Sequence, residues 1–291
     1  TVTTASVTIS SSLESAEVGS KVTLIWSSSL ASSCSASGSW SGTKTISGTE
    51  EVTIASAGSN SFSLSCSGAD INTGSSSISV EGYRNFGGKV IDGYLRGSTV
   101  YIDKNNNFLL DADEESLISD NSGSFIELRY ADGILISDGG IDLDTGAQLD
   151  SLQLSNKLSG FSDFKVITPL TTVATFMQSP ENINKIFGVD STIDLDTTDP
   201  IPSLGDSTYD NIYEKGTQLT VMALSLQNSM NAVNASTDNS KDYFESISEE
   251  LEKSYAALET AGLVDIESSA FISAVVENVT TKKASSISTE I

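Results

Sequence analysis

Histidine is absent from the 291 residues, and its absence removes several kinds of catalytic site. Without imidazole the chain has no Ser-His-Asp triad, no histidine-ligated zinc and none of the usual general bases for neutral pH. We therefore expect a protein that is not an enzyme. A hydrolase that uses paired carboxylates would need no histidine, but acidic residues are so numerous that the sequence singles out no pair.

Basic residues are also scarce, with 15 Lys and Arg against 39 Asp and Glu and a net charge of −24. Such a field repels nucleic acid and anionic membranes and attracts divalent cations. Solubility alone explains the acid excess equally well. No apolar run approaches the roughly 18 residues of a membrane span, so we expect neither nucleic acid nor membrane insertion. The first ten residues lack the pattern of a secretory signal, which we expect to be removed or to lie upstream if the protein is secreted.

Only two cysteines are present, Cys34 and Cys66. They can form one disulfide, which suits an oxidising compartment, and two buried free thiols are the alternative. A bridge would close a loop of roughly 30 residues and contribute on the order of 3 kcal/mol to stability in the chain-entropy model.

Residues 1–82 are rich in Ser, Thr and Gly and alternate apolar with polar side chains. Val22, Leu24 and Trp26 share one face of an extended segment, and residues 62–66 repeat the pattern with serines between. This period of two predicts half-buried antiparallel strands. With further strand candidates at residues 7–9, 52–54 and 78–80, the segment is typical of a small β-sandwich.

The run WSSSLASSCSASGSWSG, followed by FSLSCSG, resembles the Ig-like modules that occur in tandem in bacterial surface proteins. Trp26 precedes Cys34 and Trp40 follows it, so the antibody order of Cys, Trp and Cys is not kept. The standard bridge of an antibody domain therefore does not follow from the resemblance. The residues of this segment indicate no ligand site, so we expect the module to be a spacer.

Residues 103–114 place oxygen-bearing side chains at alternate positions and an acid at the twelfth. Such a run is how one loop wraps a hard cation such as Ca²⁺. A polar, Asn-rich turn without metal is the alternative. The predicted calcium ligands are the side chains of Asp103, Asn105, Asn107, Asp111 and Glu114, with the backbone carbonyl of Leu109.

The flanks of this loop differ from those of a calcium EF-hand, which has a helix on each side. Alternating apolar residues before position 103 predict a strand, and residues 117–119 and 125–128 predict a hairpin around a turn at 120–123. The sixth loop position, usually glycine, is Phe108. This residue must either bend differently or adopt a positive φ at a cost in energy.

A second acidic run contains Asp138, Asp142 and Asp144, with Gly139 and Gly140 between them. The glycines would let the backbone approach a ligand closely. These three carboxylates form a candidate second metal or ligand site, and solvated turn acids are the alternative.

The stretch VIDGYLRGSTVYIDKNNNFLLDADEESLISDNSGSFIEL resembles the calcium-containing β-sandwich repeats of bacterial surface adhesins. In those repeats the calcium is structural and shields the module from proteases. The later motifs GGIDLDTG, TPLTT and DLDTTDP occur in an order similar to that of large adhesin-type proteins of marine bacteria. The resemblance implies an extracellular bacterial cell-surface protein of adhesin or surface-assembly type. Its implied partners are other copies of itself or neighbouring surface modules, and a calcium-dependent peptide- or glycan-binding module is the alternative function.

From residue 168 the apolar period changes to about 3.5. Thr168 and Pro169 predict a helix start, and Gly188 predicts the end of a second short helix. Longer helices are expected over residues 208–233, from 240 to a cap at Gly262, and from a cap at Asp265. The predicted fold is thus multidomain β + α, with an Ig-like β-sandwich at 1–82, a calcium-binding β-sandwich at 83–167 and a helical bundle at 168–291.

Overall fold

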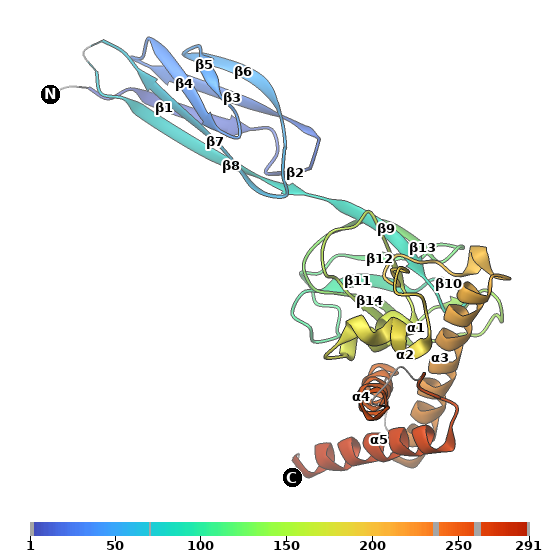
Figure 1. The fold of residues 1–291 in the computed structure, drawn as a ribbon. Coiled ribbons are helices and arrows are strands. Elements are labelled where there is room, and N and C mark those ends of the chain that lie inside the picture. Colours follow the sequence, from blue (N-terminus) through green and yellow to red (C-terminus); the bar gives the residue numbers. More distant parts are fainter. Residues whose placement is uncertain (1–2, 70, 235–238, 259–262, 290–291) are drawn as a thin grey trace. The chain divides into compact units, whose positions relative to one another are not determined.

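A computed structural model describes residues 3–69, 71–234, 239–258 and 263–289 (Figure 1). The chain divides into two units, Thr1–Asn85 and Phe86–Ile291. The first unit contains strands only, and the second contains the remaining strands and every helix of the described residues. The first boundary lies three residues beyond the predicted one.

The first unit is a sandwich of two sheets around one core. The inward side chains of both sheets, among them Leu24, Phe62 and Val80, are fully buried. The three-stranded sheet has the order β1 (Ser6–Ser11), β3 (Lys21–Ser29) and β6 (Ser47–Thr53). The five-stranded sheet has the order β2 (Ser15–Glu17), β8 (Gly74–Tyr83), β7 (Gly58–Ser67), β4 (Ser33–Gly38) and β5 (Gly42–Lys44). The period-two pattern therefore predicted the sandwich correctly.

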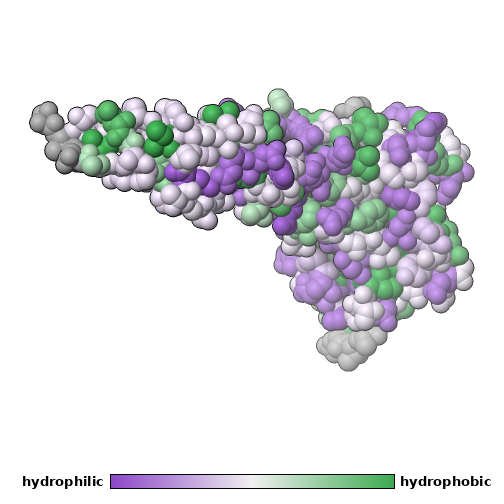
Figure 2. All heavy atoms as spheres, turned by 90° about the horizontal axis from the view of Figure 1, so that it is seen from above, coloured by the Kyte–Doolittle hydropathy of each residue, from purple (hydrophilic) through white to green (hydrophobic). Residues whose placement is uncertain are grey.

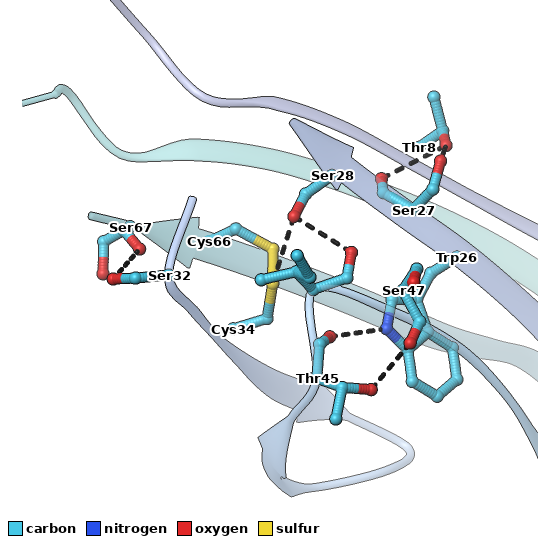
Figure 3. Close-up of a disulfide and its surroundings, with 11 residues drawn as sticks. Thr8, Trp26, Ser27, Ser28, Ser32, Cys34, Thr45, Ser47, Cys66 and Ser67 are labelled. Atoms are coloured by element: carbon cyan, nitrogen blue, oxygen red, sulfur yellow. Dashed lines mark hydrogen bonds between the residues drawn. A yellow bond between two sulfur atoms is a disulfide. The ribbon is translucent and has the colours of Figure 1, made fainter. Parts of the chain in front are cut away.

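The disulfide between Cys34 and Cys66 is present, and its surroundings appear in Figure 3. The two cysteines are directly opposite each other on the neighbouring strands β4 and β7, with their Cα atoms 4.0 Å apart. The bridge thus lies within one sheet and does not join the two sheets of the sandwich. The Ser28 hydroxyl of β3, in the other sheet, lies 3.6 Å from the Cys34 sulfur. The prediction of one bridge is confirmed.

The strands of the second unit form three sheets. An antiparallel four-stranded sheet has the order β12 (Ser116–Ile118), β11 (Thr99–Asp103), β14 (Ile134–Asp138) and β16 (Gln153–Lys157). A three-stranded sheet has the order β13 (Ser124–Arg129), β9 (Asn85–Val90) and β17 (Phe164–Ile167), and a short pair joins β10 (Leu95–Arg96) to β15 (Ile141–Asp142).

The predicted hairpin at residues 117–128 is wrong, because β12 and β13 belong to different sheets. The turn itself exists: the Asp120 carboxylate accepts the N–H groups of Ser122 and Ser124, at 2.7 and 3.0 Å, and Gly123 has φ 71°. Hydrogen bonds from Ser122 and Ser124 lower the pKa of Asp120. The turn carries the chain from one sheet to the other.

The helices follow their predicted signals closely. The Thr168 hydroxyl accepts the Thr171 N–H at 3.1 Å in a reciprocal capping box, and Gly188 ends the second helix with φ 68°. The last helix begins differently, since the Ser268 hydroxyl rather than Asp265 accepts the Phe271 N–H. The predicted cap at Gly262 lies outside the described residues. The helices are α1 (Pro169–Phe176), α2 (Ile183–Phe187), α3 (Ser207–Asn234), α4 (Lys241–Ala257) and α5 (Ser269–Thr289).

The structure differs from the three-domain prediction at residues 167/168. In Figure 1, α1 lies between the strands of the second unit and α4. Leu170 and Val173 of α1 share one core with strand residues such as Leu135 and Leu154. The carbonyl of Ser155 in β16 also accepts the Thr171 hydroxyl at 2.8 Å. The strands and helices therefore form one unit, because each layer buries the apolar face of the other.

The surface is mixed in character. On the face drawn in Figure 2, hydrophobic residues occur in small groups among hydrophilic ones. Scattered apolar side chains of this kind are ordinary on a water-exposed surface. Within the described ranges, none of the helices has both the length and the apolar character that crossing a membrane requires.

Candidate calcium-binding loop

The candidate loop connects two neighbouring strands. Residues 104–115 join β11 to β12, which pair antiparallel from Thr99 opposite Ile118 to Tyr101 opposite Ser116. The last residue of β11 is Asp103 itself. Both flanks are strands, as the sequence predicted, so the loop has no helix–loop–helix switch.

Asp103 organises the first half of the loop. Its side chain is fully buried, and its Oδ1 accepts the backbone N–H groups of Asn105 and Asn107, at 3.2 and 3.3 Å. Its Oδ2 accepts the N–H of Phe108 at 2.7 Å. Three N–H groups thus wrap around one carboxylate and compensate part of the energy of burying its charge.

Glu114 joins the two ends of the loop. It is 9% exposed, and its Oε1 accepts the Lys104 N–H at 2.7 Å. Its Oε2 accepts the Asp111 N–H at 3.1 Å. The carboxylate at the twelfth position therefore holds the second and the ninth positions of the loop together.

Asn105, Asn107 and Asp111 complete the hydrogen-bonded ring. The amide nitrogens of both asparagines donate to Asp111 Oδ2, at 2.7 and 2.9 Å. Their amide oxygens accept the N–H groups of Asn107 and Leu109, at 3.0 and 2.8 Å. The structure thus brings together all five side chains that the sequence singled out.

The donor types of the loop fit a hard cation. All five side chains offer oxygen, which Ca²⁺ and Mg²⁺ prefer, and none offers the sulfur or imidazole that zinc prefers. Among the ion pairs between described residues, none involves Asp103, Asp111 or Glu114. The nearest lysine in sequence, Lys104, directs its Nζ to the Asp113 carbonyl at 2.7 Å. Within the part of the chain that the structure describes, these three carboxylates therefore have no lysine or arginine partner at salt-bridge distance.

The carboxylates do not yet face one another. Over the described ranges of the chain, no three acidic or cysteine side chains are arranged to hold a metal ion. The reason is visible in the loop, where the carboxylates face N–H groups and the two amides present nitrogen to Asp111. A half-turn of an asparagine amide exchanges its nitrogen for its oxygen. Such turns of Asn105 and Asn107 would direct oxygen, instead of N–H, toward Asp111, and would break the hydrogen bonds that their amide oxygens accept from Asn107 and Leu109.

Phe108 takes a positive φ, which was one of the two alternatives that the sequence left open at this position. Its φ is 61°, and that of Asn106 is 62°. Its ring stacks on the Phe176 ring, with centroids 5.3 Å apart and planes 19° from parallel. Its carbonyl accepts the Gln153 amide at 3.1 Å. These contacts hold a non-glycine residue in the left-handed region, which is unfavourable for it in isolation.

Asp138, the first residue of the predicted second site, lies beside this loop. Its carboxylate accepts the Gln153 amide at 2.8 Å and the Tyr101 hydroxyl at 3.1 Å. Burial raises the pKa of Asp138, against the effect of these two hydrogen bonds. Burial and the neighbouring Asp138 charge raise the pKa of Tyr101. The Gln153 amide nitrogen, which donates to both groups, thus connects Asp138 to the Phe108 carbonyl.

Asp142 and Asp144 have a different set of partners. Asp142 accepts the Asp144 N–H at 2.9 Å and the Thr145 hydroxyl, and Asp144 accepts the Tyr213 hydroxyl at 3.1 Å. Burial, followed by its hydrogen bond to Asp144, raises the pKa of Tyr213 to about 12. The predicted second site is therefore divided between two sets of contacts, and its carboxylates already accept hydrogen bonds from the protein.

Asp92 is a half-buried carboxyl group near this second set that the sequence did not single out. Burial raises its pKa to about 7, the Thr220 hydroxyl bonded at 3.0 Å acts in the opposite direction, and the charge of Asp142 adds to the rise. The only signal in the sequence is an acid within the mainly apolar run 90–95.

No protein-family model matches the chain, and no curated protein is similar to it at a significant level. Solved structures give low similarities. The fibronectin(III)-like modules of Clostridium thermocellum CbhA align with 14% identity and a TM-score of 0.23, covering 56% of this chain and 93% of theirs. The major pilin subunit BcpA of Bacillus cereus aligns with 11% identity and a TM-score of 0.22, covering 55% of this chain and 69% of its own. Both scores are too low to carry an argument, so the function rests on the geometry.

Proposed function

We propose that this protein is a non-enzymatic, extracellular bacterial surface protein of adhesin or surface-assembly type, rigidified by structural Ca²⁺ in the loop 103–114. One observation carries the proposal: the loop gathers the carboxylates of Asp103, Asp111 and Glu114, two of them buried, without a lysine or arginine partner among the described residues. Buried charge of one sign is unfavourable unless it is compensated.

A bound divalent cation would supply the missing positive charge. Asp103, Asn105, Asn107, Asp111 and Glu114 would hold it with side-chain oxygens, together with the carbonyl of Leu109. Because the folded loop binds the ion better than the unfolded chain does, the ion stabilises the fold by about 2.7 kcal/mol at a concentration 100 times the dissociation constant. The strand flanks make this a fixed structural site.

Two further observations support the proposed setting and the proposed partners. The disulfide between Cys34 and Cys66 persists in oxidising compartments and is rare in the cytosol. The net charge of −24 disfavours nucleic acid and anionic membranes as partners. Other copies of the chain and neighbouring surface modules remain the proposed partners.

Thermal unfolding of the full chain with calcium and with EDTA tests the proposal. The two tryptophans, Trp26 and Trp40, report on the first unit, whereas circular dichroism at 222 nm reports on the helices of the second. Calcium at 100 times its dissociation constant should raise the midpoint of the second unit by about 5–10 °C and leave the tryptophan transition unchanged.

Glu114→Gln should abolish this rise, because it removes a charged ligand at the closing position. Glu115→Gln is the matched control, since Glu115 is the adjacent, exposed acid. Equal midpoints with calcium and EDTA in the native sequence would refute the proposed calcium role.

A further inference from the structure

Phe108 belongs to the cation loop but packs against the helices. Its ring stacks on Phe176, the last residue of α1, with the centroids 5.3 Å apart. The ammonium of Lys241, the first residue of α4, lies 5.0 Å from the Phe108 centroid and 6.0 Å from the Phe176 centroid. The loop, the end of α1 and the start of α4 thus meet in one stack of two rings and a cation.

Gln153 makes a second connection between the same parts. Its amide nitrogen donates to the Phe108 carbonyl at 3.1 Å and to Asp138 at 2.8 Å. Its backbone N–H donates to the Ser240 hydroxyl at 2.7 Å, and its amide oxygen accepts from Asn239 at 3.4 Å. Ser240 is fully buried directly before α4. One residue of β16 therefore holds both the loop and the start of α4.

The conformation of Phe108 depends on a predicted calcium ligand. Asp103 Oδ2 accepts the Phe108 N–H at 2.7 Å, while Phe108 holds a φ of 61° that is unfavourable for a non-glycine residue. Any change in how the Asp103 carboxylate is neutralised therefore acts on the residue that supports α1 and α4.

We propose that cation binding in the loop 103–114 and the docking of the start of α4 are coupled through Phe108 and Gln153. The inference rests on the proposed calcium site and adds a consequence for the helices. Binding tightens the attachment of residues 239–247, and by linkage the attached helix raises the affinity for the cation by the same factor. Phe176 and Lys241 are positioning residues in this coupling, since neither is a predicted calcium ligand.

Hydrogen exchange of the full chain, with and without Ca²⁺, tests the coupling. We expect calcium to slow amide exchange in residues 239–247 about fivefold, which is at the low end of ordinary coupling between sites. Phe176→Ala removes one ring of the stack and leaves every residue of the loop 103–114 unchanged. This variant should lose the slowing in α4 and bind calcium about fivefold more weakly.

Phe161→Ala is the matched control, because Phe161 is also half-buried and its ring packs against Tyr130, 5.5 Å away, in the same unit. It should respond to calcium as the native sequence does. Phe176→Leu keeps an apolar side chain at the end of α1 and serves if the alanine variant does not fold. Phe176→Leu should lose part of the calcium-induced slowing of exchange in α4 and part of the calcium affinity.

The outcomes separate the two proposals. A native chain that binds no calcium in a calorimetric titration overturns the calcium site and the coupling together. Calcium binding that slows exchange in residues 103–114 but leaves residues 239–247 unchanged overturns the coupling alone. An equal response of Phe176→Ala and the native sequence, in exchange and in affinity, overturns it as well.

Discussion

Replacing Asp92 by asparagine should stabilise the second unit at alkaline pH. Asp92 lies half-buried between β9 and β10, and the only hydrogen bond its carboxyl accepts from a described side chain comes from Thr220 of α3, at 3.0 Å. Its pKa is about 7, against an ordinary value of 3.8. Asparagine has nearly the same shape, keeps an oxygen for the Thr220 hydroxyl and carries no charge.

The direction in which stability changes with pH follows from the raised pKa of Asp92. Below about pH 4 the carboxyl is protonated in both the folded and the unfolded chain, so its contribution to stability is fully present. Between about pH 4 and 7 the folded chain binds more protons than the unfolded chain, and stability falls as the pH rises. The loss is complete above about pH 7. A difference of about three pKa units between the folded and the unfolded chain corresponds to a loss of at most roughly 4 kcal/mol in the free energy of unfolding. Because the site can relax around the charge, we expect a loss of about 2–4 kcal/mol.

Guanidinium unfolding followed at 222 nm, at constant calcium concentration, measures this difference. The free energy of unfolding of Asp92→Asn should exceed that of the native sequence by about 2–4 kcal/mol at pH 8, and the two values should be equal at pH 4. Asp163→Asn, at an exposed aspartate of the same unit, should change neither value. Equal stability of Asp92→Asn and the native chain at pH 8 would refute the argument.

Three further predictions concern the fold. Replacing Cys34 and Cys66 by serine should lower the stability of the first unit by roughly 3–4 kcal/mol, read from tryptophan fluorescence, with the 222 nm transition unchanged. Leu170→Ala should cost about 2–5 kcal/mol and shift the strand and helix signals of the second unit together; separate transitions would contradict a shared core. Thr168→Ala should cost about 1 kcal/mol through loss of the cap, measured by urea unfolding at 222 nm, whereas Thr175→Ala later in α1 should cost less.

The features that the sequence predicted well are local ones. Alternating side chains around Leu24 and Leu64 placed two strands of the sandwich, since the period of a strand is independent of its partners. The caps at Thr168 and Gly188 depend only on neighbouring backbone groups. The ring of side chains in the loop 103–114 is likewise local, so its residues could be named in advance.

The features that it missed depend on long-range pairing. The turn at Asp120 looked like a hairpin because nothing local reveals that β12 and β13 join different sheets. The raised pKa of Asp92 comes from burial by distant parts of the chain, such as α3, whose Thr220 is 128 residues away in the sequence. In α5, Phe271 is buried whereas the adjacent Ile272 is 40% exposed, a difference that the apolar period alone does not decide. The packing of α1 on β16, which joins two predicted domains into one unit, is equally invisible to periodicity.

A calorimetric titration of Ca²⁺ into the calcium-depleted full chain tests the central proposal most directly. We predict a binding event with a dissociation constant at or below about 1 mM, the range of extracellular calcium modules. It should disappear in Glu114→Gln and remain in Glu115→Gln. A native chain without calcium binding, or equal binding by the native chain and Glu114→Gln, would contradict a calcium site in the loop 103–114.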